Sequence, residues 1–189
     1  MRFIEHFRLK DKRSFMSPSS YSWVNYDEQK MDARIHASFA ARRGTDLHDV
    51  AQRLIRLGVK LPDTPETINA YVNDCIGFRM TPEQTLYYSD NCFGTADAIG
   101  FRQNKLRIFD LKTGINKTSM MQLFVYAALF CLEYGFRPVA IETELRIYQN
   151  DDVFVEDDQE VIVLEVTRIM SQIVTFDERI QELEKEVYG

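Results

Sequence analysis

The 189-residue chain has few cysteines and no cysteine pair. Cys75, Cys92 and Cys131 show no Cys-x-x-Cys spacing, which argues against a disulfide framework and against a zinc or iron–sulfur site built from cysteine. No apolar run reaches the roughly 18 residues that a membrane span needs. The opening residues carry charge where a signal peptide would be apolar. We therefore expect a cytoplasmic protein without a membrane partner.

An overall excess of basic residues is also missing, because 23 Lys and Arg stand against 29 Asp and Glu, for a net charge of −6. The charges are unevenly distributed, however. Residues 150–189 hold 12 acids and 3 bases, whereas residues 1–60 hold 12 bases and 7 acids. Binding to a polyanion depends on a local patch more than on the total, so the net charge does not exclude a nucleic-acid partner.

Helical and strand-like periodicities alternate along the chain. Helices are predicted over 46–57, 66–78, from Thr118 or Ser119 to just before Gly135, and over 157–187, and strands over 85–88, 94–101, 106–112 and 139–148. This order predicts an α/β or α+β fold with a mixed central β-sheet flanked by helices and a long C-terminal helix. We assign residues 1–156 to one domain and residues 157–189 to a helix of the same domain or to an oligomerisation element.

The N-terminal region is predicted to contain another helix. Ser17 and Pro18 have the residue types of an N-cap and a first helical position, and the helical pattern continues towards Ala41. Arg42-Arg43-Gly44-Thr45 is predicted to interrupt it, and Gly58 to end the helix that follows.

The two central strands carry unusual acids for a β-sheet, because Asp is depleted in strands. Side chains alternate across a strand, so Asp110 and Lys112 share a face. A two-residue turn at Gln103 and Asn104 would place Asp97 directly opposite Asp110, with Cβ atoms about 5 Å apart. Two such carboxylates repel each other unless a cation lies between them, and Mg²⁺ or Mn²⁺ prefers oxygen ligands of this kind. The alternative is a solvated or salt-bridged surface hairpin.

Several segments together resemble a known family. Gly94-Thr95-Ala96-Asp97 and Phe109-Asp110-Leu111-Lys112-Thr113-Gly114 resemble the core of the PD-(D/E)XK nuclease superfamily, in its RecB-like branch of CRISPR-adaptation nucleases and phage exonucleases. Gly44-Thr45-Asp46-Leu47-His48 resembles the first motif of that branch. Gln122-Leu123-Phe124-Val125-Tyr126 resembles its Q-x-x-x-Y motif, and Ser17-Pro18-Ser19-Ser20 its usual helix start. The resemblance implies a restriction-endonuclease-like core.

The resemblance also implies roles in metal-assisted phosphodiester hydrolysis. Asp97 and Asp110 would ligate Mg²⁺ or Mn²⁺, together with the Leu111 carbonyl and His48. Lys112 would position or polarise the attacking water. Gln52 stands where many relatives carry a glutamate, which leaves the site with fewer charges. No iron–sulfur cluster is expected, because no cysteine follows Cys131 and Asn25-Tyr26-Asp27 occupies the first cysteine region of the clustered relatives.

Gln122 and Tyr126 are implied to contact DNA or to orient the catalytic lysine, so Gln122 joins Asp97, Asp110 and Lys112 in the catalytic set. Residues 120–134 are apolar on nearly all sides, which predicts a buried helix with these two side chains on one face. Arg42, Arg43 and Lys117 are candidates for phosphate contacts that do not depend on base identity.

We therefore predict a metal-dependent DNA nuclease, favouring an exonuclease of phage or bacterial recombination and DNA processing. Its partners would be DNA ends or single strands and an annealing or replication protein. Two alternatives remain open: a structure-specific endonuclease, and a non-catalytic oligomeric DNA-binding protein on a nuclease fold.

The C-terminal helix has an apolar repeat that alternates spacings of four and three residues. Its members are Ile162, Val166, Ile169, Ile173, Phe176, Ile180, Leu183 and Val187. Such a repeat is typical of a coiled coil, which would make a homo-oligomer. It equally fits a long helix packed across its own sheet.

Overall fold

The computed structural model describes residues 14–114 and 118–188. The chain divides into two units, residues 1–42 and residues 43–189. The long helix α1 (Glu28–Leu57) passes through the boundary. Each unit is described by itself below.

In the first unit, the predicted helix start at Ser17 and Pro18 is confirmed, but as a 3-10 helix, η2 (Pro18–Asn25). The Ser17 side chain hydrogen-bonds the Ser19 hydroxyl at 2.8 Å instead of capping a backbone N–H. The Trp23 indole N–H donates to the Ser17 carbonyl at 3.1 Å, which closes this short segment on itself.

The predicted interruption at 42–45 is wrong, because α1 continues through it without a break. Gly44 is buried, and a Cβ atom there would lie 2.7 Å from the Thr113 hydroxyl. The glycine therefore allows α1 to approach Thr113 closely, and it does not end the helix. The predicted end is confirmed at Gly58, whose φ of 67° allows the Val59 and Gly58 N–H groups to bond the Leu54 and Ile55 carbonyls.

The second unit contains one five-stranded mixed sheet, with strands in the order β1-β2-β3-β4-β5. The strands are β1 (Thr81–Ser89), β2 (Cys92–Arg102), β3 (Lys105–Leu111), β4 (Glu142–Gln149) and β5 (Asp152–Glu156). Only the β3–β4 pair is parallel, and the crossover between them contains α3 (Met121–Tyr134). With α2 (Thr67–Gly77) and α4 (Gln159–Tyr188), helices flank the sheet, so the predicted α+β fold class is confirmed.

Hydrophobic cores lie on both faces of the sheet. One is built from α3, α4 and strand residues such as Leu106, Ile108 and Leu145. The other is built from α2, the end of α1 and strand residues that include Phe109 and Leu111. Because neighbouring β3 residues divide between the two cores, β3 is buried on both faces, as expected of a central strand in a parallel pair.

The starts of two strands and the presence of a fifth strand are the main differences from prediction. β1 begins at Thr81, four residues earlier than expected. β4 begins at Glu142, because residues Pro138–Ala140 form the 3-10 helix η3. Strand β5 was not predicted, since its five residues lie between the turn at Asn150 and Asp151 and the start of the C-terminal helix.

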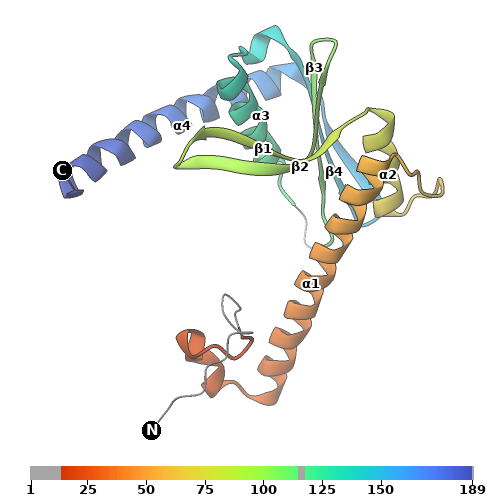
Figure 1. The fold of residues 1–189 in the computed structure, drawn as a ribbon, viewed down its shortest axis with the longest axis vertical. Helices are drawn as coiled ribbons and strands as arrows, with labels where there is room; N and C mark the ends of the chain where they lie inside the picture. The colour runs from red at the N-terminus through yellow and green to blue at the C-terminus, as the bar shows by residue number, and fades with distance from the viewer. Residues whose placement is uncertain (1–13, 115–117, 189) are drawn as a thin grey trace. The chain divides into compact units, whose positions relative to one another are not determined.

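Helix α4 uses only part of its apolar repeat inside the unit. Ile162, Val166 and Ile169 are buried in the core with α3, whereas Phe176 and Val187 are exposed. In Figure 1 the helix runs on beyond the sheet towards the C-terminus. Within the described residues, none of the helices combines the length and the hydrophobicity that crossing a membrane would require.

Candidate metal centre

The β2–β3 hairpin has the predicted register. Gln103 and Asn104 form its two-residue turn with φ values of 50° and 59°, the left-handed pair of a type I′ turn. Ala98 pairs with Phe109, so Asp97 and Asp110 occupy the next opposed positions along the two strands. The short turn therefore fixes the two acids as neighbours.

Asp97 lies between α1 and the end of β3. Its Oδ2 accepts a hydrogen bond from the Leu111 N–H at 2.9 Å and lies 3.4 Å from Nδ1 of His48 on α1. His48, Asp97 and Glu83 each offer a ligand atom within 4.8 Å of the others. This arrangement brings together two predicted ligands, His48 and Asp97, and fixes the predicted Leu111 peptide beside them.

Glu83 was missed by the sequence analysis because its strand was predicted to begin at Thr85. A bulge also shifts the register. Ser89 pairs with Cys92 at the hairpin turn, but Tyr87 pairs with Phe93, so one extra residue of β1 is inserted between these pairs. Without that bulge, counting from the turn would place Gln84 opposite Asp97. Glu83 adopts a φ of 53°, which is unusual for a residue with a side chain and typical of functional sites.

The other predicted catalytic residues form a chain of hydrogen bonds beside these ligands. Lys112 Nζ donates to Asp110 Oδ1 at 3.1 Å and to Gln122 Oε1 at 2.9 Å. Gln122 Nε2 donates to the Tyr126 hydroxyl at 3.2 Å, and that hydroxyl donates to the Thr95 carbonyl at 2.6 Å. The motif helix α3 is therefore connected through the lysine to β3 and through the tyrosine to β2.

Gly94 makes room for this chain of hydrogen bonds. A Cβ atom at position 94 would lie 3.1 Å from the Tyr126 ring. Half of the residues of α3 are buried, which is less than predicted, and Gln122 and Tyr126 are the polar side chains that it turns towards Lys112.

The electrostatics of the site favour a bound cation. Burial raises the pKa of Asp97, although His48, the Leu111 N–H and Lys112 partly oppose the shift. Burial and repulsion by Asp97 raise the pKa of Asp110. We call His48, Glu83, Asp97, Asp110 and Lys112 the acidic cluster. Its carboxylates outnumber its one permanent cation by three to one.

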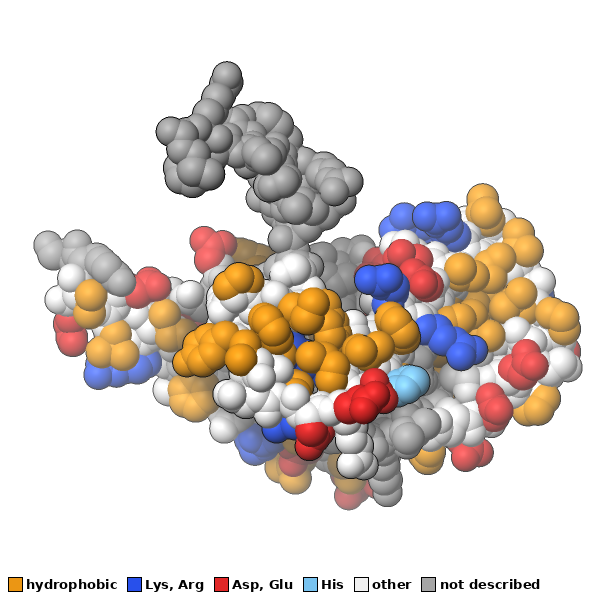
Figure 2. Space-filling model, turned by 90° about the horizontal axis from the view of Figure 1, so that it is seen from below, with side chains coloured by type: hydrophobic (Ala, Val, Ile, Leu, Met, Phe, Trp, Pro, Cys, Tyr) orange, Lys and Arg blue, Asp and Glu red, His pale blue; other side chains and the backbone are white. Residues whose placement is uncertain are grey.

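Asp110 is paired with Lys112 through both of its carboxylate oxygens. Among the residues that the structure describes, its buried Oδ2 accepts no hydrogen bond of good geometry but lies 2.9 Å from Lys112 Nζ, in an ion pair. The lysine therefore partly neutralises Asp110, while Asp97 repels it. On the face drawn in Figure 2, acidic side chains lie beside a histidine and border an area of hydrophobic side chains.

The predicted DNA contacts divide into three groups. Gln122 and Tyr126 lie at the acidic cluster, as described above. Arg42 and Arg43 are both exposed on α1. Arg42 is the last residue of the first unit, and Arg43 is the first residue of the second unit, which contains the acidic cluster. Lys117 lies outside the described residues.

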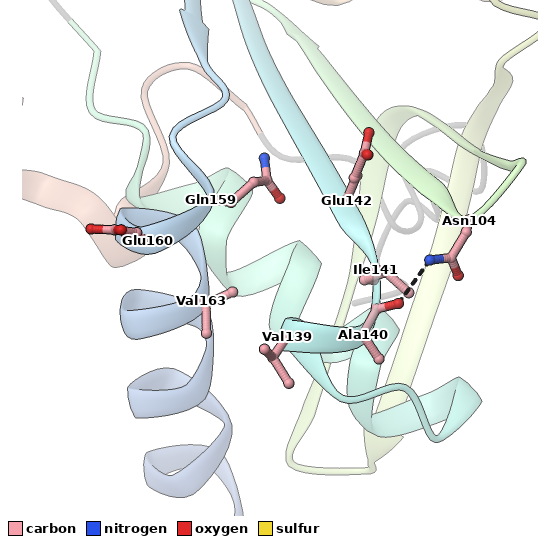
Figure 3. A pocket seen from close by; sticks show the side chains of 8 residues that line it. All are labelled: Asn104, Val139, Ala140, Ile141, Glu142, Gln159, Glu160 and Val163. Carbon is pink, nitrogen blue, oxygen red and sulfur yellow. Dashed lines mark hydrogen bonds between the residues drawn. The ribbon is translucent and has the colours of Figure 1, made fainter.

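A cavity of about 480 Å³ lies at the opposite end of β3 and β4 (Figure 3). Its lining is mainly apolar, and Asn104 closes one side by donating to the Ala140 carbonyl at 2.7 Å. The side chains that line it are those of Asn104, Val139, Ala140, Ile141, Glu142, Gln159, Glu160 and Val163. These residues include neither a histidine nor a lysine, so the chemistry of the acidic cluster is not repeated there.

Comparison with known proteins adds no family to this description: no protein-family model matches the chain, and no curated protein matches it. The geometry of the site and the sequence motifs are therefore the basis for assigning a function.

Proposed function

We propose that this protein is a metal-dependent deoxyribonuclease that hydrolyses phosphodiester bonds. The observation that carries the proposal is the acidic cluster, in which His48, Glu83 and Asp97 come together beside the Asp110–Lys112 pair at the end of β3. The raised pKa values of Asp97 and Asp110 support a site that is completed by a cation.

The donor set fits Mg²⁺ or Mn²⁺. Glu83 and Asp97 offer hard carboxylate oxygens beside the single imidazole of His48, which is compatible with Mn²⁺. Asp110 lies outside that group of three but close enough to Asp97 to be repelled by it, and we assign it as a further carboxylate ligand. We assign the Leu111 carbonyl to the same set. A divalent ion bound there would lower the pKa of a water ligand and neutralise charge on the scissile phosphate.

The remaining residues act through position and charge. Lys112 is restrained by two acceptors, Asp110 and Gln122, so its ammonium group can hold an attacking water or a phosphate oxygen beside the carboxylates. Tyr126 is a positioning residue, because its hydroxyl joins Gln122 to the backbone of β2. Burial raises the pKa of Tyr126, which keeps its hydroxyl available as a donor.

DNA is the proposed substrate because the motifs resemble those of RecB-like nucleases, and that resemblance favours an exonuclease. Arg43 offers an exposed cation on α1, five residues before His48. The β1–β2 hairpin that carries Glu83 and Asp97 also exposes the stacked rings of Tyr87 and Phe93, against which unpaired bases can pack. We place the activity in the cytoplasm of a bacterium or phage-infected cell, with an annealing or replication protein as partner.

The test is cleavage of 5′- and 3′-labelled linear DNA and of closed circular DNA with Mg²⁺ or Mn²⁺. Asp110→Asn and Lys112→Ala should abolish cleavage. Glu142→Gln is the matched control, because it removes one negative charge from an exposed position at the other end of the sheet.

The outcomes separate the alternatives. Metal-dependent loss of linear DNA alone supports the exonuclease, and the label shows its polarity. Cutting of the circle assigns an endonuclease. DNA binding without cleavage in the wild type and in both site variants would overturn the proposal in favour of a non-catalytic DNA-binding protein.

A further inference from the structure

The second half of α4 carries an apolar stripe that the described part of the second unit leaves exposed. Its side chains are 61 % exposed at Phe176, 38 % at Ile180, 42 % at Leu183 and 69 % at Val187. We call these four residues the distal seam. They continue the repeat whose first members, Ile162, Val166 and Ile169, are no more than 5 % exposed.

The helix is held firmly where the distal seam begins. The Asp177 carboxylate accepts hydrogen bonds from the Ser89 hydroxyl at 2.7 Å, from Asn91 at 3.0 Å and from Gln181 at 2.8 Å. These bonds join α4 to the β1–β2 turn, while the neighbouring Phe176 side chain stays exposed. The distal seam therefore begins where hydrogen bonds fix α4 to the sheet, and its side chains remain exposed.

The residue types on the distal seam suit a two-stranded parallel coiled coil. A spacing of four from Phe176 to Ile180 and of three from Ile180 to Leu183 assigns Ile180 and Val187 to heptad position a, and Phe176 and Leu183 to position d. β-branched residues at a with leucine at d favour parallel dimers.

The flanking charges are compatible with this arrangement. Arg179 falls at position g and Glu184 at position e, so a parallel, in-register pair would place each Arg179 beside Glu184 of a second copy. An antiparallel pair would place Asp177 near Glu184, which is repulsive, but Arg179 near Glu186, which is attractive, so the residue types at a and d decide the orientation.

We propose that the distal seam forms a parallel, in-register two-stranded coiled coil with a second copy of this chain. Four apolar layers make a small interface, so the dimer is reversible and dissociates in the micromolar range. It brings two copies of the second unit together through their C-terminal helices.

Sedimentation of the wild type over about 5 to 500 µM tests association directly, and needs no nuclease activity. Leu183→Glu should remove the dimer, and at a dilution where the wild type is monomeric its circular dichroism and thermal unfolding should match those of the wild type, because position 183 is exposed. Arg179→Glu and Glu184→Arg should each weaken dimerisation by about tenfold, and the double variant should restore it to within about threefold. Glu178→Arg, at outward position f, is the control that should have little effect.

Orientation is tested with Val187→Cys, which faces its own counterpart only in the parallel arrangement. The variant is made in a Cys92→Ser background, because Cys92 is only partly buried, whereas Cys75 and Cys131 are buried. Mild oxidation should link the two chains of this variant and leave the Cys92→Ser parent unlinked. A wild type that stays monomeric at every concentration would overturn the proposal, as would a dimer insensitive to Leu183→Glu. Efficient linking of a Phe176→Cys, Val187→Cys pair without linking of the single variant would assign an antiparallel dimer instead.

Discussion

Strand β3 carries a charged cluster at each end, and the two clusters differ in their numbers of cations and anions. Near its start, Lys105 and Arg107 share Glu144 of β4, at 2.9 Å and 3.3 Å. Arg146 completes this group by pairing with Glu144 at 2.6 Å and with Asp74 of α2 at 2.8 Å. We call these five residues the ion-pair cluster. It contains three cations and two anions, whereas the acidic cluster contains three carboxylates and one lysine.

The pKa directions follow this difference. Burial alone would raise the pKa of Glu144, but hydrogen bonds and charges from Lys105 and Arg146 outweigh it, so the pKa is lowered. At Asp97 and Asp110 burial dominates and the pKa values are raised. Each carboxylate of the ion-pair cluster has a cationic partner, whereas the carboxylates of the acidic cluster outnumber its lysine. We therefore expect the first cluster to contribute to the fold and the second to bind a cation.

Removing a carboxylate from the acidic cluster should have the largest effect on activity. Asp110→Asn keeps the side-chain shape but removes a proposed metal ligand, and we expect cleavage to fall by about 10³-fold or more. Stability without metal should stay the same or increase, because the raised pKa means that the ionised form is disfavoured in the fold. DNA cleavage and urea unfolding measure the two effects, and a large loss of stability would contradict the comparison.

The matched change in the ion-pair cluster should reduce stability and leave metal binding unchanged. Glu144→Gln leaves Lys105 and Arg107 without their shared carboxylate, so we expect a loss of about 2–3 kcal/mol in unfolding free energy. The affinity for Mn²⁺ should not change. Calorimetric metal titration of this variant, beside urea unfolding, checks both statements. Weakened metal binding would mean that the two clusters are coupled.

The pH dependence should separate the clusters further. Because the pKa values of Asp97 and Asp110 are raised, these groups bind protons at a pH where an ordinary carboxylate is ionised, and each proton competes with a metal ion. The stabilisation by Mn²⁺, about 2.7 kcal/mol at a hundredfold excess over the dissociation constant, should disappear as pH falls through the raised values.

Glu144 should lose its contribution at a lower pH than the two aspartates lose the metal, because its pKa is lowered where theirs are raised. Its lowered pKa means that its stabilising contribution is complete above the ordinary glutamate pKa and is lost only as pH falls through the lower value. Melting temperatures with and without Mn²⁺ between pH 8 and pH 4 test both groups. In Glu144→Gln the metal-dependent difference should keep the pH profile of the wild type.

The hairpin part of the acidic cluster could be predicted from the sequence. A two-residue turn fixes the register of the two strands, so opposed residues can be found by counting outwards from the turn. Asp97 and Asp110 follow from Gln103 and Asn104 in this way. Glu83 could not, because the bulge between Tyr87 and Ser89 changes the count by one and leaves no clear sequence signal.

The fold class was predictable for a similar reason, since long periodic segments define helices and strands whatever their neighbours are. The continuity of α1 was not, because a buried glycine in a helix and a glycine that ends a helix look alike in sequence. In the structure the approach of Thr113 marks Gly44 and the positive φ marks Gly58, and neither feature can be read from the local sequence. The ion-pair cluster was also missed, because its partners come from α2, β3 and β4 and no local spacing connects them.

The smallest expected effect concerns the support of the lysine in the acidic cluster. Gly94→Ala would place a Cβ atom 3.1 Å from the Tyr126 ring, so the ring must move by a few tenths of an ångström. That shift would pass through the Tyr126 and Gln122 hydrogen bonds to Lys112. We expect cleavage to slow by about threefold to tenfold, with less than about 1 kcal/mol of stability lost. Gly77→Ala is the control, because no atom lies within 4 Å of its added Cβ. If both variants cleave DNA like the wild type, Tyr126 does not position the lysine, and the acidic cluster depends on Asp110 and Gln122 alone for that role.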